Sequence, residues 1–245
     1  MFDKMNEPLV IKNNDFKRCI IFISYPILDY REEILKILER IAFNRSNKYN
    51  TDQKIAVVNI NNYCLSYNSK IAFIGNSPFL EFSLSYPSYE CLGEDVLEDN
   101  LKFIKEIIYN PYLEGGVFPK NKVEDAITFY KNNVDRISTD FFSYYDYKND
   151  LLIDENDYLI SKVFKNPSLL DNVTSNGLHD TYNKIISGSP LVYLIGNVNV
   201  DKSKELIKKI LLNNKISKVR FKMDYYVYAK CIPFSINIII HLKSN

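Results

Sequence analysis

Histidine is nearly absent from this sequence, and its scarcity excludes more chemistry than any other feature of the composition. The chain of 245 residues contains two histidines, His179 and His241. Zinc hydrolases hold the metal with imidazole or carboxylate ligands on one face, usually with histidines at positions i and i+4 of a helix. Neither histidine has a His or Glu partner at that spacing. We therefore predict no metal site and no cofactor.

An excess of charge of one sign is also missing. Lys and Arg number 31 against 30 for Asp and Glu, which gives a formal net charge of +1. A protein that binds nucleic acid needs a basic face to neutralise phosphates. The balance of charge therefore predicts no nucleic-acid partner.

Long hydrophobic segments are missing too. The longest apolar run near the end, residues 232–242, is interrupted by Pro233, Ser235, Asn237 and His241. It is far shorter than the roughly 20 apolar residues that a membrane-spanning helix requires. The first residues include acids and no apolar stretch, which is unlike a secretory signal. We expect no membrane span and a cytoplasmic location.

The four cysteines are too scattered to form an obvious framework or a redox motif. They are Cys19, Cys64, Cys91 and Cys231, and no two form a C-x-x-C pair. We expect Cys19 and Cys64 to pack as small hydrophobic residues in a reducing compartment, with a disulfide framework as the alternative. No serine lies in a G-x-S-x-G turn and no cysteine has an electropositive, glycine-flanked setting, so we predict no catalytic residue.

The residues that are present are those of an ordinary globular protein, with 46% hydrophobic and 25% charged. In the first half, a short apolar run with β-branched and aromatic residues predicts a strand at 18–25, and helical spacing of apolar residues predicts an amphipathic helix at 29–43. Turn residues between two strand-like runs predict a hairpin from 64–74 and 79–86. Residues 51–60 are ambiguous, because Thr51 and Asp52 favour a helix start while the β-branched residues favour a strand.

The second half is mainly helical by the same criteria. We predict one domain over residues 1–212, followed by a strand-like extension over 213–245 that is broken at Pro233. The expected helices cover about 94–110, 119–137, 155–164, 175–188 and 201–211, and a buried strand covers 191–196.

Tyrosine is abundant and tryptophan absent, with nineteen and none respectively. Aromatic residues gather at 141–147 and at 224–228. Surfaces rich in aromatic rings bind peptides or protein partners, whereas rings at half-buried positions only complete a core. For the first cluster both interpretations stay open. Its candidate residues for binding a peptide or a partner are Phe142, Tyr144, Tyr145 and Tyr147.

The order of the segments over about residues 15–212 resembles one half of an insulinase-like (M16) metallopeptidase, especially the bacterial branch whose members often lack the zinc motif. The segments that carry the resemblance are Asp15-Phe16-Lys17 before a strand, Ile107-Ile108-Tyr109-Asn110-Pro111, Gly116-Val117-Phe118 before a long helix, Gly177-Leu178, and the strand Leu191 to Val198.

The resemblance implies an α+β half-domain of the LuxS–metallopeptidase type, with an antiparallel sheet and helices packed on one face. It also implies that residues 51–60 are helical. Active members of the family carry H-x-x-E-H on the first long helix. Here that helix, read from Asp29 to Arg40, contains no histidine, so no zinc ligand is carried over.

Two functions remain in view. The resemblance implies a non-catalytic subunit that pairs with a partner, either an M16-like chain such as a zinc-bearing relative or a second copy, in peptide binding or processing. The alternative is an interaction module that has no role in proteolysis and binds a protein or peptide through residues 141–147. A stand-alone hydrolase with an unrecognised site is a third possibility.

Overall fold

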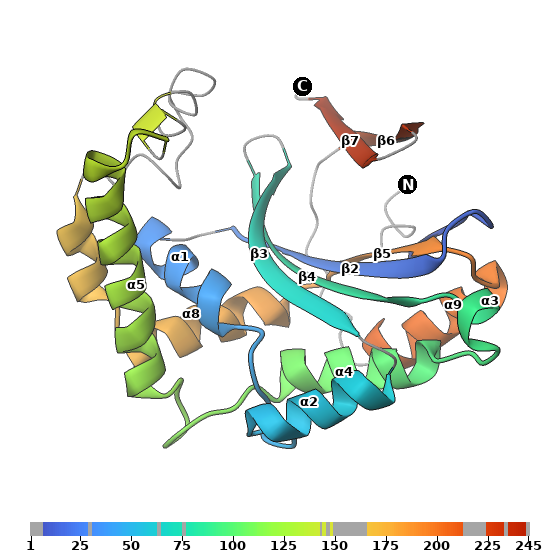
Figure 1. The fold of residues 1–245 in the computed structure, drawn as a ribbon, viewed down its shortest axis with the longest axis horizontal. Helices are drawn as coiled ribbons and strands as arrows, with labels where there is room; N and C mark the ends of the chain where they lie inside the picture. Colours follow the sequence, from blue (N-terminus) through green and yellow to red (C-terminus); the bar gives the residue numbers. More distant parts are fainter. Residues whose placement is uncertain are drawn as a thin grey trace.

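The computed structural model describes residues 7–28, 31–62, 65–74, 77–142, 144, 145, 148, 166–212, 224–232 and 235–243 (Figure 1). Five strands form one sheet in the order β1-β5-β2-β4-β3. Their bounds are Leu9–Lys12 for β1, Arg18–Pro26 for β2, Ser66–Ile74 for β3, Ser77–Pro87 for β4 and Leu191–Gly196 for β5.

Pairing in this sheet is antiparallel from β5 through β2 and β4 to β3. This confirms the antiparallel sheet expected from the sequence. The addition is β1, which joins the edge parallel to β5, with Val10 opposite Leu194. β1 could not be predicted from the sequence, because four residues are too few to show a periodicity and a parallel partner lies far away along the chain.

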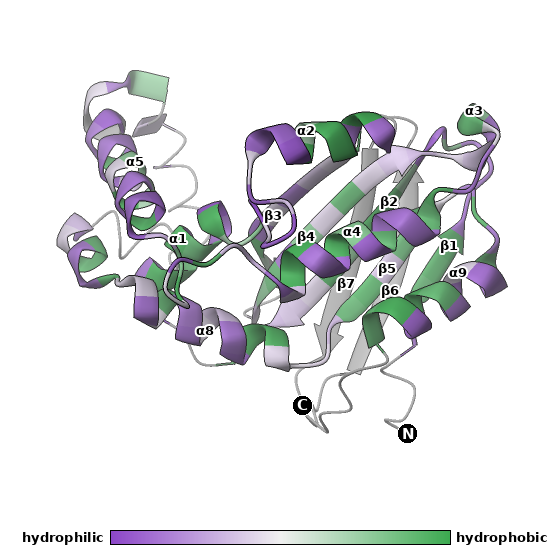
Figure 2. Ribbon diagram, turned by 90° about the horizontal axis from the view of Figure 1, so that it is seen from below, coloured by the Kyte–Doolittle hydropathy of each residue, from purple (hydrophilic) through white to green (hydrophobic). Residues whose placement is uncertain are grey.

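The helices pack against one face of the sheet, as expected. Seen from below, α4 and α9 cross that face, and α1, α5 and α8 lie beyond its β3 end (Figure 2). The bounds are Glu32–Ile41 for α1, Asp52–Asn61 for α2, Tyr89–Leu92 for α3, Leu97–Tyr109 for α4, Lys120–Thr139 for α5, Ser175–Ser187 for α8 and Val200–Ile207 for α9, with a 3-10 turn at Pro167–Asn172 and a π turn at Lys208–Leu212.

The core lies between this sheet face and the helices. Alternate residues of β2 face the helices, and Ile21, Ile23 and Tyr25 are fully buried there. They meet the apolar face of α4, which includes Ile104 and Ile107. The strand, with a side-chain period of two, and the helix, with a period of 3.6, therefore each direct one apolar face to the same core.

Residues 51–60 are helical, so the ambiguity in the sequence is resolved as the resemblance implied. The Thr51 hydroxyl accepts a hydrogen bond from the Lys54 amide at 3.3 Å and caps α2. Ile55 is buried, whereas Val57 and Ile60 are exposed. The N-cap and one anchoring side chain thus override the strand propensity of the β-branched residues.

Some predicted helix ends differ by one to three residues. Thr174, rather than Ser175, caps α8 by accepting from the Gly177 amide at 3.1 Å. Asn199, rather than Asp201, caps α9 by accepting from Lys202. Neighbouring polar residues compete for the N-cap position, and the periodicity of the apolar residues does not show which of them occupies it. The helix predicted at 155–164 lies outside the described residues.

The strands on either side of Pro233 are β6, Asp224–Ile232, and β7, Ser235–Lys243, which pair with each other in a separate antiparallel hairpin. They fall in the segment predicted as a strand-like extension. Across the described residues, no helix combines the length and apolarity needed to cross a bilayer.

Candidate functional site

The start of α1 is the place where the resemblance would put a zinc motif. Its first-turn carboxylates, Glu32 and Glu33, are 5% and 9% exposed. The Arg31 guanidinium lies 3.5 Å from the Glu33 carboxylate. Within the described part of the chain, no three His, Cys, Asp or Glu side chains are grouped to hold a metal. The helix start therefore presents acidic side chains without imidazole beside them.

His179 has a packing role on α8. Its ring is half-buried and lies edge-on to Phe118, with 6.1 Å between the ring centroids. The Asn183 side-chain nitrogen is 3.1 Å from Nε2. The contacts of His179 with the Phe118 ring and the Asn183 side-chain amide are those of a structural residue at the helix surface. His241 belongs to β7, in the separate hairpin.

The aromatic residues predicted as a binding surface follow directly on the end of α5. Asp140 is extended and ends α5, and beyond it the Tyr144 amide donates to the Asp140 carbonyl at 2.9 Å, as in a helical turn. Phe142 is 75% exposed, Tyr145 55% and Tyr144 47%. The structure therefore brings three of the four predicted residues together in the open, and Tyr147 lies outside the described residues.

Phe141 completes what we call the α5 aromatic patch, which consists of Phe141, Phe142, Tyr144 and Tyr145. Phe141 is 73% exposed and stacks on Tyr145, with 6.5 Å between the centroids. The Lys148 ammonium lies 5.4 Å from the Tyr144 ring. Exposed rings of this size each offer about 150–250 Å² for burial in a complex.

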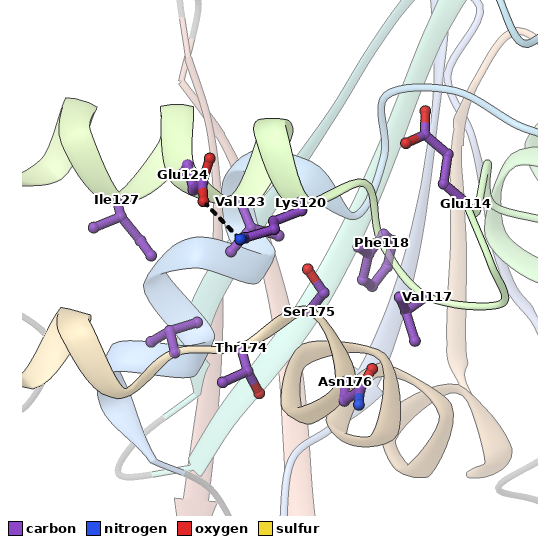
Figure 3. Close-up of a pocket in the computed structure, with 11 residues that line it drawn as sticks. Glu114, Val117, Phe118, Lys120, Val123, Glu124, Ile127, Thr174, Ser175 and Asn176 are labelled. Carbon is purple, nitrogen blue, oxygen red and sulfur yellow. Dashed lines mark ion pairs between the residues drawn. The ribbon is translucent and has the colours of Figure 1, made fainter.

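A pocket of about 470 Å³ lies between the start of α5 and the start of α8 (Figure 3). Phe118, Val123 and Ile127 give it apolar walls. Some of its polar groups are already engaged, since Lys120 pairs with Glu124 at 3.6 Å and the Thr174 hydroxyl accepts from the Gly177 amide. The pocket suits an apolar side chain. The pocket could not be predicted from the sequence, because its walls come from segments about fifty residues apart in the chain.

A second hollow, of about 370 Å³, lies beside the outer edge of β3 and includes Glu39 and Tyr130. The Glu39 carboxylate accepts a hydrogen bond from the Ile71 amide at 3.2 Å and lies 3.6 Å from the Lys36 ammonium. Burial raises the pKa of Tyr130 to about 12. An acid from α1 thus occupies the edge of the outermost strand.

No family model matches this sequence, and no curated protein is similar to it. Solved structures do match. A conserved protein from Enterococcus faecalis V583 has a TM-score of 0.69 at 19% identity, over 85% of this chain and 51% of that one. The first half of the periplasmic protease PqqL from Escherichia coli has a TM-score of 0.59 at 12% identity, over 92% of this chain and 48% of that one.

A protease from Helicobacter pylori also matches, with a TM-score of 0.51 at 12% identity, over 88% of this chain and 50% of that one. At these identities the likeness concerns the fold alone. The chain spans about half the length of these neighbours, and 24% of whole PqqL. The fold of this chain is therefore similar to that of the first half of PqqL and of the other two neighbours, which supports the resemblance at the level of the fold alone.

Proposed function

We propose that this protein is a non-catalytic M16-like subunit that pairs with a partner in peptide binding or processing. The observation that carries the proposal is the coverage. Most of this chain, 85–92%, matches about half of proteins that contain a further region of similar length. In this proposal a partner chain supplies the counterpart of that further region.

The composition of α1 supports the non-catalytic part of the proposal. The helix that would carry H-x-x-E-H contains no histidine, and the sequence has only two in all. A site made of carboxylates alone favours hard cations such as Ca²⁺ and Mg²⁺. Zinc sites in proteins also use the nitrogen of histidine or the sulfur of cysteine. Any zinc-dependent hydrolysis would then come from the partner.

The test is recovery of the tagged full chain from the cells that make it, with the stoichiometric partner identified by mass spectrometry. The proposal predicts a second M16-like chain that carries H-x-x-E-H, or a second copy of this chain. The same preparation is assayed for turnover of quenched fluorescent peptides. A chain that stays monomeric up to high concentration and brings down no stoichiometric partner would contradict the pairing.

The α5 aromatic patch favours a second candidate, an interaction module with no role in proteolysis. Four neighbouring aromatic rings, each 47–75% exposed, form an unusually large exposed aromatic area for a surface that binds no partner. Replacing Tyr144, Tyr145 and Tyr147 with Ala should then abolish partner binding without unfolding the chain. The matched control is Tyr89→Ala, which removes a 60% exposed ring elsewhere. Unchanged affinity in the triple variant would exclude this candidate.

A further inference from the structure

Asparagine followed directly by glycine occurs once in this sequence, at Asn176-Gly177, and the pair lies in the first turn of α8. Gly177 is the one glycine of the seven that follows an asparagine. Asparagine is a chemically labile side chain, because its amide is lost when the backbone nitrogen of the next residue attacks it. A glycine at that next position makes the attack easiest, since it has no Cβ and its backbone is the most permissive.

The reaction is deamidation, and its co-reactants are water and hydroxide. The Gly177 amide nitrogen loses its proton and bonds to the side-chain carbonyl carbon of Asn176. The bond from that carbon to the side-chain nitrogen breaks, ammonia leaves with the proton, and a succinimide ring closes. Water then opens the ring at either carbonyl and leaves Asp or isoaspartate at position 176. In sum, one water is consumed and one ammonia is released.

The structure holds the attacking nitrogen in a hydrogen bond. The Thr174 hydroxyl accepts from the Gly177 amide at 3.1 Å as the N-cap of α8. At the other end of the same residue, the Gly177 carbonyl accepts from the Thr181 hydroxyl at 2.8 Å. Both peptide groups of Gly177 are therefore fixed in the helix, and its N–H is engaged with Thr174.

The cap depends on the same glycine and leaves the asparagine open to solvent. A Cβ built on Gly177 would lie 3.2 Å from the Thr174 Oγ1, which is tighter than an ordinary contact. Asn176 is exposed and lies beside Thr174 at the lip of the pocket between α5 and α8 (Figure 3). Water and hydroxide therefore reach Asn176, and the cap rather than burial protects it.

We propose that Asn176 is a modification site at which this chain deamidates spontaneously, and that opening of the Thr174 cap sets the rate. The first turn of a helix frays, and such local openings occur without unfolding of the rest of the molecule. Each opening frees the Gly177 nitrogen and lets the backbone leave the helical conformation. The ring can close only in that open state.

Deamidation places a negative charge where a helix favours one. A carboxylate in the first turn interacts favourably with the helix dipole, so the Asp product keeps α8 in place. The isoaspartate product runs the chain through the side-chain carbon, which lengthens the backbone and disrupts the first turn. Both products cancel the formal net charge of +1, and the Asp form adds its charge to the lip of the pocket.

Ageing of the purified full chain at mildly alkaline pH tests the proposal. Peptide mapping by mass spectrometry follows each asparagine, and chromatography separates Asp from isoaspartate. A synthetic peptide of residues 172–182 gives the rate without the fold. We expect Asn176 to convert at least about tenfold more slowly in the folded chain than in the peptide, because conversion waits for the cap to open. In urea, Asn176 should be the first asparagine of the chain to convert.

Matched variants locate the control at the cap. Thr174→Val removes the accepting oxygen and keeps the shape, and it should speed conversion about fivefold, the factor that corresponds to the usual contribution of an N-cap. Thr174→Ser keeps an accepting hydroxyl and should leave the rate unchanged. Gly177→Ala should suppress conversion. Circular dichroism shows that each variant is folded, and Thr181→Val, which frees the Gly177 carbonyl instead, replaces Thr174→Val where the latter does not fold.

Three outcomes would overturn the proposal. Conversion at one rate in the folded chain and in the peptide would show that the cap gives no protection. Equal rates in Thr174→Val and Thr174→Ser would place the control elsewhere. Absence of conversion at Asn176 in every folded variant, over a period in which the peptide converts completely, would show that the site never opens.

Discussion

Tyrosine hydroxyl groups join α4 to the sheet and α8 to α4. The hydroxyl oxygens of Tyr25 and Tyr109 are 2.6 Å apart, and the Tyr182 hydroxyl donates to the Ile108 carbonyl, also at 2.6 Å. Ile108 lies in the last turn of α4, where carbonyls have no partner within the helix. Burial raises the pKa of both Tyr25 and Tyr182 well above the usual value. Tyrosine therefore serves here as a core residue with one polar contact.

Replacing Tyr182 with Phe should remove that contact and leave the Ile108 carbonyl buried without it. We expect the free energy of unfolding to fall by about 1–2 kcal/mol, measured by urea denaturation. Tyr112→Phe is the matched control, because its hydroxyl bonds Glu114 at the surface. Equal effects in the two variants would contradict the assigned role.

The buried thiol of Cys19 predicts how stability depends on pH. Burial is the main cause that raises its pKa from 9.0 to about 11. The unfolded chain therefore releases this proton first, and between these pH values the folded state holds more protons. Stability should be unaffected by this group below pH 9 and should fall as the pH rises towards 11.

The measurement is urea unfolding at pH 8 and at pH 10. From Cys19 alone we expect a loss of about 1 kcal/mol between the two, and Cys19→Ser should reduce the loss. Tyr130, with its pKa raised to about 12, adds to the decline in the same direction. Equal stability at the two pH values would refute the prediction.

At the scale of elements, β5 and β2 approach each other closely at Gly196. A Cβ on Gly196 would lie 2.8 Å from the Cys19 Cα and 2.7 Å from its Sγ, and φ is +150°. The backbone of β2 cannot move away without breaking its pairing with β4. Only glycine fits at the end of β5.

Gly196→Ala should therefore cost about 3 kcal/mol or more, or prevent folding. Gly115→Ala is the control, since φ is +61° there and nothing lies within 4 Å of the added Cβ. It should cost only about 1–2 kcal/mol. Thermal unfolding of both variants compares them, and losses of equal size would show that the close approach is unimportant.

Glu39 protects the outer edge of β3. An uncovered edge strand is a template for pairing with another chain, and acidic side chains at an edge prevent this. Glu39→Ala frees the Ile71 amide and should increase self-association, seen as larger species in sedimentation velocity. Lys36→Ala removes only the ion-pair partner of Glu39 and should leave the extent of self-association unchanged. Identical sedimentation profiles for Glu39→Ala and Lys36→Ala would contradict the role of Glu39 at the β3 edge.

Elements were predictable from the sequence where local signals agreed. β2 follows from its short apolar run of β-branched and aromatic residues, and α4 from the periodicity of its apolar residues. Residues 51–60 needed the family resemblance, because their N-cap and their β-branched residues point to different structures. β1 could not be predicted, since it is defined by a parallel pairing with β5, which lies more than a hundred residues away.

On the scale of the whole molecule, the M16-like layout was predictable and the surfaces were not. The sequence located the aromatic residues at 141–147, but their exposure depends on where α5 ends relative to the other helices. The pocket between α5 and α8 has no local signature, because Phe118 and Thr174 meet only in the folded chain. Among the described residues, the candidate for function is therefore an exposed surface.

The most direct test of the central claim is turnover of a quenched fluorescent peptide library by the purified full chain, with and without added Zn²⁺. A non-catalytic subunit should give no turnover above background under either condition, and addition of its zinc-bearing partner should restore cleavage that a chelator abolishes. Zinc-dependent turnover by the chain alone would contradict the account.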